Sequence, residues 1–489
     1  MTISKVKTFR NVIYSSLTKG LTLACVAITS LVVARNLTPS DYGVVGFAGI
    51  IIGFLSNFSD MGVGNAAIRS PVLHQQHLQS AFTLKVILSL GAFVFALFIA
   101  PFSRHLFDHP ATANVIRVLA VNFLVSTIGF LPMVVLTREM NYRAMMIPGV
   151  AGAVVQSILA VGLVLHGWNY WSVVIASVGA TLASGIAMQL TKRVPIGFRL
   201  DRIEMQEYLQ FGIPLFASGV LIFLIFNLDN FLVGATMGST QLGYYALAFT
   251  WGSFICGLLY DTVNNVMFPA YSAIQNDPAA LRRWYLKTVD LVAFIAVIAN
   301  TALLANAHFF LVTFLGKGTS KWVPATTSLE ILCVYGIMRA MTEPLGPCLM
   351  AGGRTRTILH AAVLAGMVEL MLLLLALRTG KIELVATAVL AAYASQAMVY
   401  LPFLRHEFSV SVGDITARIW PIVPALTMGW FITSLLPSSF GSTFITLAMR
   451  GLFTAVIASL AHGLCSRFRC FLEVGGLISQ NLAREVPLP

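Results

Sequence analysis

The chain has 489 residues, of which 57% are hydrophobic and only 10% charged, and its mean hydropathy is +0.84. This composition excludes a soluble globular domain and indicates a polytopic membrane protein. The formal charge of +12 comes from cations scattered over short loops, a pattern that argues against nucleic acid as a partner and favours membrane topology and anionic lipids.

Apolar segments recur along the whole chain. A transmembrane helix needs about 20 mostly apolar residues to cross roughly 30 Å of hydrocarbon, and about fourteen segments meet this requirement. We therefore expect an all-α polytopic membrane protein whose helices are joined by short loops. The expected spans cover residues 11–34, 42–64, 81–103, 112–136, 145–166, 169–190, 209–236, 242–268, 286–315, 324–350, 357–377, 383–403, 418–436 and 443–464.

The loop cations predict the orientation of these spans. If the N-terminus is inside, 20 Lys and Arg residues lie on the cytoplasmic side and 6 on the opposite side. Short loops rich in Lys and Arg stay in the cytoplasm, so we expect both termini to be cytoplasmic. The first span ends at Arg35 without a small-residue cleavage site, which favours a retained helix over a signal peptide.

The chain also resembles itself at an offset of 200 residues. Both matching windows cover the end of one span, a short outer turn and the next span. Six spans separate the copies, and an even number preserves membrane orientation, so we expect two parallel-repeat lobes of six helices each around a central cavity. The lobes would be residues 1–203 and 204–404, with two C-terminal helices and a cytoplasmic tail in residues 405–489. The residues that recur unchanged are Val33, Gly43, Ala48, Phe54, Val63 and Asn65.

Several motifs resemble a known family. The first outer turn reads VVARNLTPSDYGVVGFAGIIIGFLSNFSDMGVGNAAIRS (residues 32–70), and FGIPLFASGVLIFLIFNLDNFLVGATMGSTQLGYYALAF (residues 211–249) opens the second lobe. With LPMVVLTREMNYRAM (residues 131–145) and GWNYWSVV at the start of the sixth span, these motifs resemble Wzx-like flippases, the polysaccharide transporter branch of the multidrug, oligosaccharidyl-lipid and polysaccharide exporter superfamily.

The resemblance implies a function. Such proteins of the bacterial inner membrane move undecaprenyl-pyrophosphate-linked repeat units to the periplasmic leaflet by alternating access, for exopolysaccharide, capsule or O-antigen synthesis. The implied partners are the lipid-linked glycan and membrane lipids, with a polysaccharide polymerase and export machinery as further options. No cofactor and no enzymatic activity are implied, and Na⁺ or H⁺ are the options for a coupling ion.

Charge is distributed unevenly between the two lobes. Residues 1–203 carry 15 Lys and Arg against 5 Asp and Glu, whereas residues 204–489 carry 16 against 14. A pyrophosphate must be hidden from hydrocarbon during transport, and cations facing a cavity would do this. The first lobe is therefore the candidate anion-binding lobe.

Four early cations are the substrate-site candidates, each with a structural alternative. Lys19 lies some eight residues into its span, well inside the membrane, although a long Lys stem also permits snorkelling to the headgroups. Snorkelling is a stronger rival for Lys85 and Arg117, which lie four or five residues into their spans. Arg69 follows the second span and is equally explained as a positive-inside loop charge.

Late carboxylates are the candidates for coupling or gating. Asp229 stands in NLDN in the middle of its span, where it would hold a proton or Na⁺ or pair with a cation of another helix. Glu369 is also mid-span among apolar neighbours. Arg339 and Glu343 are four residues apart on one helix face and are expected to pair. The prolines that follow them break the helix, which suits either a hinge or a static kink.

Other functions remain open. A lipid II-type flippase shares the pyrophosphate handle, and a drug or cation antiporter of the same superfamily would have the same twelve-span core with carboxylates in the main cavity. A membrane enzyme such as a polymerase or glycosyltransferase would require a large outer loop, and the longest one here has about ten residues. The six cysteines form no CxxC pair or zinc-like spacing, so no metal site is expected.

Overall fold

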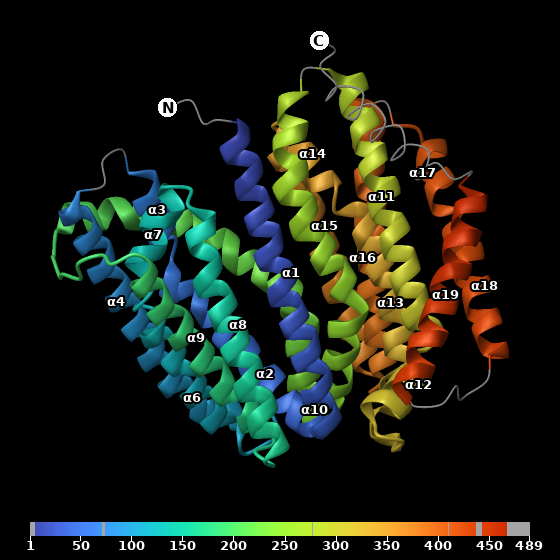
Figure 1. The fold of residues 1–489 in the computed structure, drawn as a ribbon, viewed down its shortest axis with the longest axis horizontal. Coiled ribbons are helices and arrows are strands. Elements are labelled where there is room, and N and C mark those ends of the chain that lie inside the picture. The colour runs from blue at the N-terminus through green and yellow to red at the C-terminus, as the bar shows by residue number, and fades with distance from the viewer. Residues whose placement is uncertain (1–4, 71–73, 276, 409, 437–442, 467–489) are drawn as a thin grey trace, which may run out of the picture. The chain divides into compact units, whose positions relative to one another are not determined.

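The computed structural model describes residues 5–70, 74–275, 277–408, 410–436 and 443–466, and leaves some helical side chains, that of Lys19 included, outside this description. Every regular element in these ranges is a helix (Figure 1). The chain divides into two compact units, residues 1–246 and 247–489. The expected all-α membrane class is confirmed, whereas the expected lobe boundaries at residues 203 and 404 stay a prediction.

Unit 1 runs from α1 into the first half of α10. Within it, α8 packs against α1 and α9, and α6 packs against α2, α4 and α9. Figure 1 shows these helices side by side in blue to green. The elements are α1 (Lys5–Asn36), α2 (Pro39–Asp60), α3 (Val63–Arg69), α4 (Gln75–Ile99), α5 (Ser103–Leu106), α6 (Thr112–Val125), α7 (Phe130–Arg138), α8 (Tyr142–Leu165), α9 (Trp171–Thr191) and α10 (Arg202–Ala273).

Unit 2 begins within α10. Its central helix α11 packs against α13, α16, α18 and α19. The last two expected spans, which correspond to α18 and α19, therefore pack against α11. The elements are α11 (Pro278–Ala305), α12 (Ala307–Phe309), a π-helical turn (Phe310–Leu315), a 3₁₀ turn (Ser320–Ala325), α13 (Thr326–Thr342), α14 (Leu345–Ala351), α15 (Thr355–Leu377), α16 (Ile382–Phe408), α17 (Val412–Ile419), α18 (Ile422–Leu435) and α19 (Thr443–Cys465).

All fourteen expected spans fall on helix, but the helices do not map one to one onto spans. By length and composition, ten described helices could cross a membrane, or eleven if α6 and α7, which bend by 52° at their junction, form one span. The 72 residues of α10 would extend about 108 Å as one straight helix, more than three times the hydrocarbon thickness. The number fourteen therefore stays a prediction.

The long helix α10 is broken at Gly238. This residue has φ 85° and ψ 179°, a conformation open to glycine and strained for other residues. Asp108 accepts a hydrogen bond from the backbone N–H of Ser239 at 2.9 Å, so its carboxylate satisfies a donor at the start of the second half of α10. The break thus separates the seventh expected span from the eighth.

The two repeated outer turns pack against each other within unit 1. A Cβ on Gly43 would collide with the carbonyl oxygen of Ser239, and a Cβ on Gly243 would collide with the carbonyl oxygen of Pro39. Because Ser239 and Gly243 lie 200 positions after Pro39 and Gly43, the contact is reciprocal, as a twofold relation between duplicated segments requires. The hydroxyls of Ser40 and Ser239 are 2.9 Å apart.

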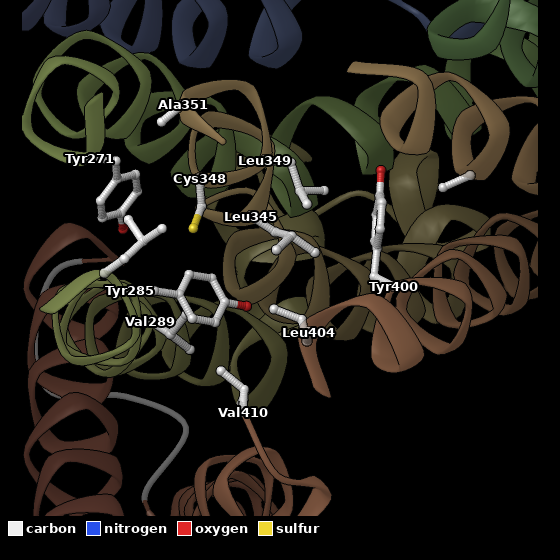
Figure 2. Packing of buried hydrophobic residues seen from close by; sticks show 12 residues of the cluster. Tyr271, Tyr285, Val289, Leu345, Cys348, Leu349, Ala351, Tyr400, Leu404 and Val410 are labelled. Carbon is white, nitrogen blue, oxygen red and sulfur yellow. The ribbon is translucent and has the colours of Figure 1, made fainter. Parts of the chain in front are cut away.

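The core of unit 2 holds a helical break in place. Figure 2 shows Leu345, Cys348 and Leu349 of α14 among Tyr271 of α10 and Tyr285 of α11. The tenth expected span is broken into α13 and α14. The shorter helix, α14, is held in place by this packing. Within a membrane, such contacts stabilise the unit through van der Waals packing rather than through removal of apolar surface from water.

Candidate functional site

A cavity of about 440 Å³, lined by both polar and apolar residues, lies in unit 1. It is bordered by the end of α2, the middle of α4, the bend between α6 and α7, and facing parts of α8 and α9. Glycines let these helices approach closely, because a Cβ on Gly129 would lie 3.2 Å from the Cα of Gly185. The polar side chains that line the cavity are Asp60, Lys85, Ser126, Thr181 and Ser184.

Lys85 is the cation of this cavity. Its side chain is only 6% exposed, and its ammonium donates to the carboxylate of Asp60 at 2.9 Å. It also donates to the carbonyl oxygen of Ser59 at 3.0 Å and to the hydroxyl of Ser59 at 3.2 Å. A desolvated ammonium is tolerated only when it is paired and hydrogen-bonded, and this one has three acceptors for three N–H groups.

The position of Lys85 at the end of α2 also has a structural effect. Ser59 and Asp60 are the last two residues of α2, where backbone carbonyls lack helical partners and the helix dipole is negative. The ammonium donates to one of these carbonyls, and its positive charge interacts favourably with the negative end of the helix dipole. Lys85 therefore both stabilises the end of α2 and presents positive charge to the cavity.

Two of the other predicted substrate-site cations, Arg117 and Arg69, do not join this cluster. Arg117 is exposed and donates to Asn114 at 2.8 Å, and Arg69 is exposed with its guanidinium 4.8 Å from the centre of the Phe211 ring. The side chain of Lys19 lies outside the described residues. A substrate role for each of the three stays a prediction.

Asp229 is a deeply buried carboxylate. It is 2% exposed, and it accepts hydrogen bonds from the Tyr245 hydroxyl at 2.6 Å and the Asn230 amide at 3.1 Å. Asp229 and Tyr245 lie on opposite sides of the α10 break, so their bond ties the two halves together. Among the described residues no Lys or Arg forms an ion pair with Asp229, and its neutralisation therefore depends on hydrogen bonds or on a proton or cation.

Arg339 and Glu343 form the expected pair at the end of α13. Their side chains are each 12% exposed, and Arg339 donates to Glu343 at 2.9 Å. Arg339 also donates to the Tyr335 hydroxyl at 3.3 Å and lies 6.0 Å from the centre of the Tyr393 ring on α16. Because α13 ends at Thr342, this pair sits at the break before α14. Glu369 is half-buried on α15, and its role stays a prediction.

Two residues of these centres escaped prediction from the sequence. Asp60 stands in SDMG at the end of the second span, where it resembles an ordinary loop residue, and Tyr245 resembles an interfacial aromatic. The available signal for Asp60 was its place at a helix C-terminus, where a carboxylate is disfavoured unless a cation holds it. Among the described residues no group of His, Cys, Asp and Glu side chains could hold a metal ion.

Comparison with known proteins identifies the family of the segment that contains this cavity. The family described as "Polysaccharide biosynthesis protein" matches residues 32–327, which include α2, α4, α6, α7, α8 and α9. The chain belongs to this family. The match covers both repeated outer turns as well as the whole of the cavity.

Two known proteins are similar to this chain in sequence, and one solved structure is similar to it in fold. The lipopolysaccharide biosynthesis protein WzxC of Escherichia coli (strain K12) is 24% identical over 71% of this chain and 70% of the relative. The teichuronic acid biosynthesis protein TuaB of Bacillus subtilis (strain 168) is 22% identical over 60% of this chain and 61% of the relative. The lipid II flippase MurJ in an inward closed conformation shares the fold, with a TM-score of 0.74 and 13% identity over 94% of this chain and 99% of that chain.

These findings confirm the expected family and the multi-pass membrane class. The fold is similar to those of the lipid II flippase MurJ and of a multidrug resistance transporter of the MATE family. The chain is therefore a multi-pass membrane protein of the polysaccharide-biosynthesis family.

Proposed function

We propose that the chain flips an undecaprenyl-pyrophosphate-linked oligosaccharide across the bacterial inner membrane for exopolysaccharide, capsule or O-antigen synthesis. The single observation that carries this proposal is the buried Lys85 on a cavity inside the segment that matches the polysaccharide family. The printed names of WzxC and TuaB, which describe polysaccharide biosynthesis, support the glycan part of the proposal. The MurJ resemblance supports the fold.

The chemistry of the cavity suits a glycolipid headgroup. A pyrophosphate needs a cation and hydrogen-bond donors once it leaves water, and Lys85 with the hydroxyls of Ser126, Thr181 and Ser184 provides them. With both termini in the cytoplasm, the end of α2 lies on the cytoplasmic side, where the headgroup would enter. The polyprenyl tail would stay in the hydrocarbon, so that only the headgroup requires a polar path.

Ion coupling is the second part of the proposal. Asp229 would be neutralised by H⁺ or Na⁺, since no cation pairs with it among the described residues. Its bond to Tyr245 across the α10 break would let that neutralisation change the relation of the two helix halves. The polymerase and export machinery are proposed as partners that receive the flipped glycan.

Deletion of the gene tests the proposed function. We expect loss of surface polysaccharide and accumulation of undecaprenyl-linked repeat units on the cytoplasmic side, both reversed by the wild-type gene. Normal polysaccharide together with altered drug tolerance would contradict the proposal and favour an antiporter. A block in peptidoglycan synthesis would instead indicate a lipid II substrate.

Substitution of Lys85 tests the proposed site separately. We expect Lys85→Ala to reduce polysaccharide export at least about tenfold, equivalent to about 1.4 kcal/mol of binding free energy, and Lys85→Arg to restore part of it. Lys192→Ala is the matched control and should export normally, because Lys192 belongs to the same unit and pairs with Glu139 outside the cavity. Normal export by Lys85→Ala, with protein levels confirmed by immunoblot, would contradict the site.

A further inference from the structure

We infer that Asp60 is a tethered counter-ion that occupies the anion site of Lys85 until a polyanionic headgroup displaces it. The inference rests on the proposed function, because it takes Lys85 as the cation that binds the pyrophosphate. It adds a second residue to the site, one that sets the selectivity for anions of high charge.

The first step is the hydrogen-bond capacity of Lys85. An ammonium has three N–H donors, and in this structure they are taken by the carbonyl oxygen of Ser59, the hydroxyl of Ser59 and the carboxylate of Asp60, at 3.0, 3.2 and 2.9 Å. An incoming anion therefore reaches a short contact with Lys85 only if one acceptor leaves.

The second step is to compare what each acceptor loses by leaving. Ser59 is 2% exposed, and its hydroxyl also lies 2.9 Å from that of Ser89, so its displacement would leave buried polar groups unsatisfied, which is costly. The Asp60 side chain is 68% exposed. Most of this side chain is already in contact with water, so its carboxylate loses little solvation in the ion pair and returns to water at little cost.

The third step is the position of Asp60 at the end of α2. A carboxylate at a helix C-terminus is repelled by the helix dipole, and Asp60 is the last residue of α2. Once a bound anion neutralises Lys85, the attraction that holds Asp60 is gone and the repulsion remains. The geometry thus favours exchange of Asp60 for the headgroup over simultaneous binding of both.

The turn after Asp60 connects this exchange to α10. Met61 and Gly62 both have positive φ, at 37° and 68°, and the carbonyl of Met61 packs so closely on Gly212 of α10 that a Cβ there would collide with it. Release of Asp60 therefore acts at the point where the end of α2 meets the beginning of α10.

Selectivity follows from the charges. With Asp60 in place the site is neutral, so a singly charged anion exchanges one carboxylate for an equivalent charge and gains little. The pyrophosphate of a lipid-linked glycan is a diester with two negative charges, and its remaining oxygens would reach the hydroxyls that line the cavity. Asp60 would therefore exclude cytoplasmic monoanions from the Lys85 site.

Titration of inorganic pyrophosphate into the purified full-length chain in detergent tests the inference. We expect Asp60→Asn to bind pyrophosphate about fivefold more tightly than the wild type, equivalent to about 1 kcal/mol, because the bound anion no longer has to displace a competing carboxylate. Lys85→Ala should bind at least tenfold more weakly. Glu139→Gln is the matched control, because Glu139 also pairs with a lysine of unit 1, Lys192 at 2.9 Å, but outside the cavity. Its affinity should stay within twofold of the wild type.

Each contrary outcome has a distinct meaning. If Asp60→Asn binds with unchanged or weaker affinity while Lys85→Ala loses binding, Asp60 is no counter-ion and the Lys85 site stands. If Glu139→Gln tightens binding as much as Asp60→Asn does, the effect is one of overall charge and the inference is overturned. If none of the proteins binds pyrophosphate, or Lys85→Ala binds like the wild type, the inference also falls, whereas the flippase proposal is still decided by the deletion phenotype. Circular dichroism and gel filtration of each variant exclude loss of fold as the cause.

Discussion

At the scale of single residues, the buried charges of this protein differ in how they are compensated. Lys85 has a carboxylate and two serine oxygens around it, and Arg339 has Glu343 and the ring of Tyr393. Among the described residues, the side-chain partners of Asp229 are the Tyr245 hydroxyl and the Asn230 amide, and no cation pairs with it. Because an uncompensated charge in a low-dielectric interior is costly, we expect Asp229 to bind a proton or a cation.

A substitution at Asp229 tests this difference. We expect Asp229→Asn to reduce ion-driven export at least about tenfold, because the amide keeps the volume and accepts the Tyr245 hydrogen bond but carries no titratable charge. The thermal stability of the purified variant should change little. Export that depends on the ion gradient as in the wild type would contradict a coupling role.

At the scale of elements, the candidate functional residues lie at or beside breaks in helices. The α6–α7 bend borders the cavity of Lys85, the α10 break at Gly238 is spanned by the Asp229–Tyr245 bond, and the end of α13 carries the Arg339–Glu343 pair. Broken helices are stable in membranes where protein or a polar cavity satisfies the freed backbone groups. In each case a polar or charged side chain lies at the break.

The reciprocal contact of the outer turns predicts an asymmetry between two glycines of α2. We expect Gly43→Ala to destabilise the protein by about 1–3 kcal/mol, as overpacking does, and to impair export, because its Cβ would meet the Ser239 carbonyl. Gly49→Ala is the control, since nothing lies within 4 Å of a Cβ at that position. Thermal unfolding followed by gel filtration measures both, and equal effects would contradict the contact.

The Arg339–Glu343 pair predicts a coupling energy. Removal of one partner of a buried pair leaves an uncompensated charge at a cost of about 3–5 kcal/mol, so we expect Arg339→Met or Glu343→Gln alone to lower stability strongly. The double variant should lose less than the sum of the two. A double-mutant cycle of unfolding free energies makes the measurement, and additive losses would show that the two side chains act independently.

At the scale of the whole molecule, the distribution of charged residues predicts the orientation in the membrane. The first 203 residues carry most of the excess positive charge, and the buried Lys85 and its cavity lie among them. We expect a fluorescent protein fused after residue 489 to fluoresce, because it folds only in the cytoplasm, and a phosphatase fused after Lys317 in an outer loop to be active. Phosphatase activity at the C-terminus instead would contradict the predicted orientation.

The sequence by itself determined the membrane class, the approximate spans, the family and the pairing of Arg339 with Glu343. Hydropathy, loop charge and helical spacing are local properties, and they are legible without coordinates. The repeat at an offset of 200 residues also predicted which turns correspond, although not that Gly43 and Gly243 pack on each other's turns.

Only the tertiary structure decided which cations are buried. Lys85 and Arg117 lie at similar depths in their spans, yet one is enclosed beside Asp60 and the other is exposed. The same holds for the partners Asp60 and Tyr245, which lie 25 and 16 residues from Lys85 and Asp229. The physical reason is that burial and pairing depend on how helices distant in the chain pack against each other. The residue pattern of a single helix does not show which helix packs against it.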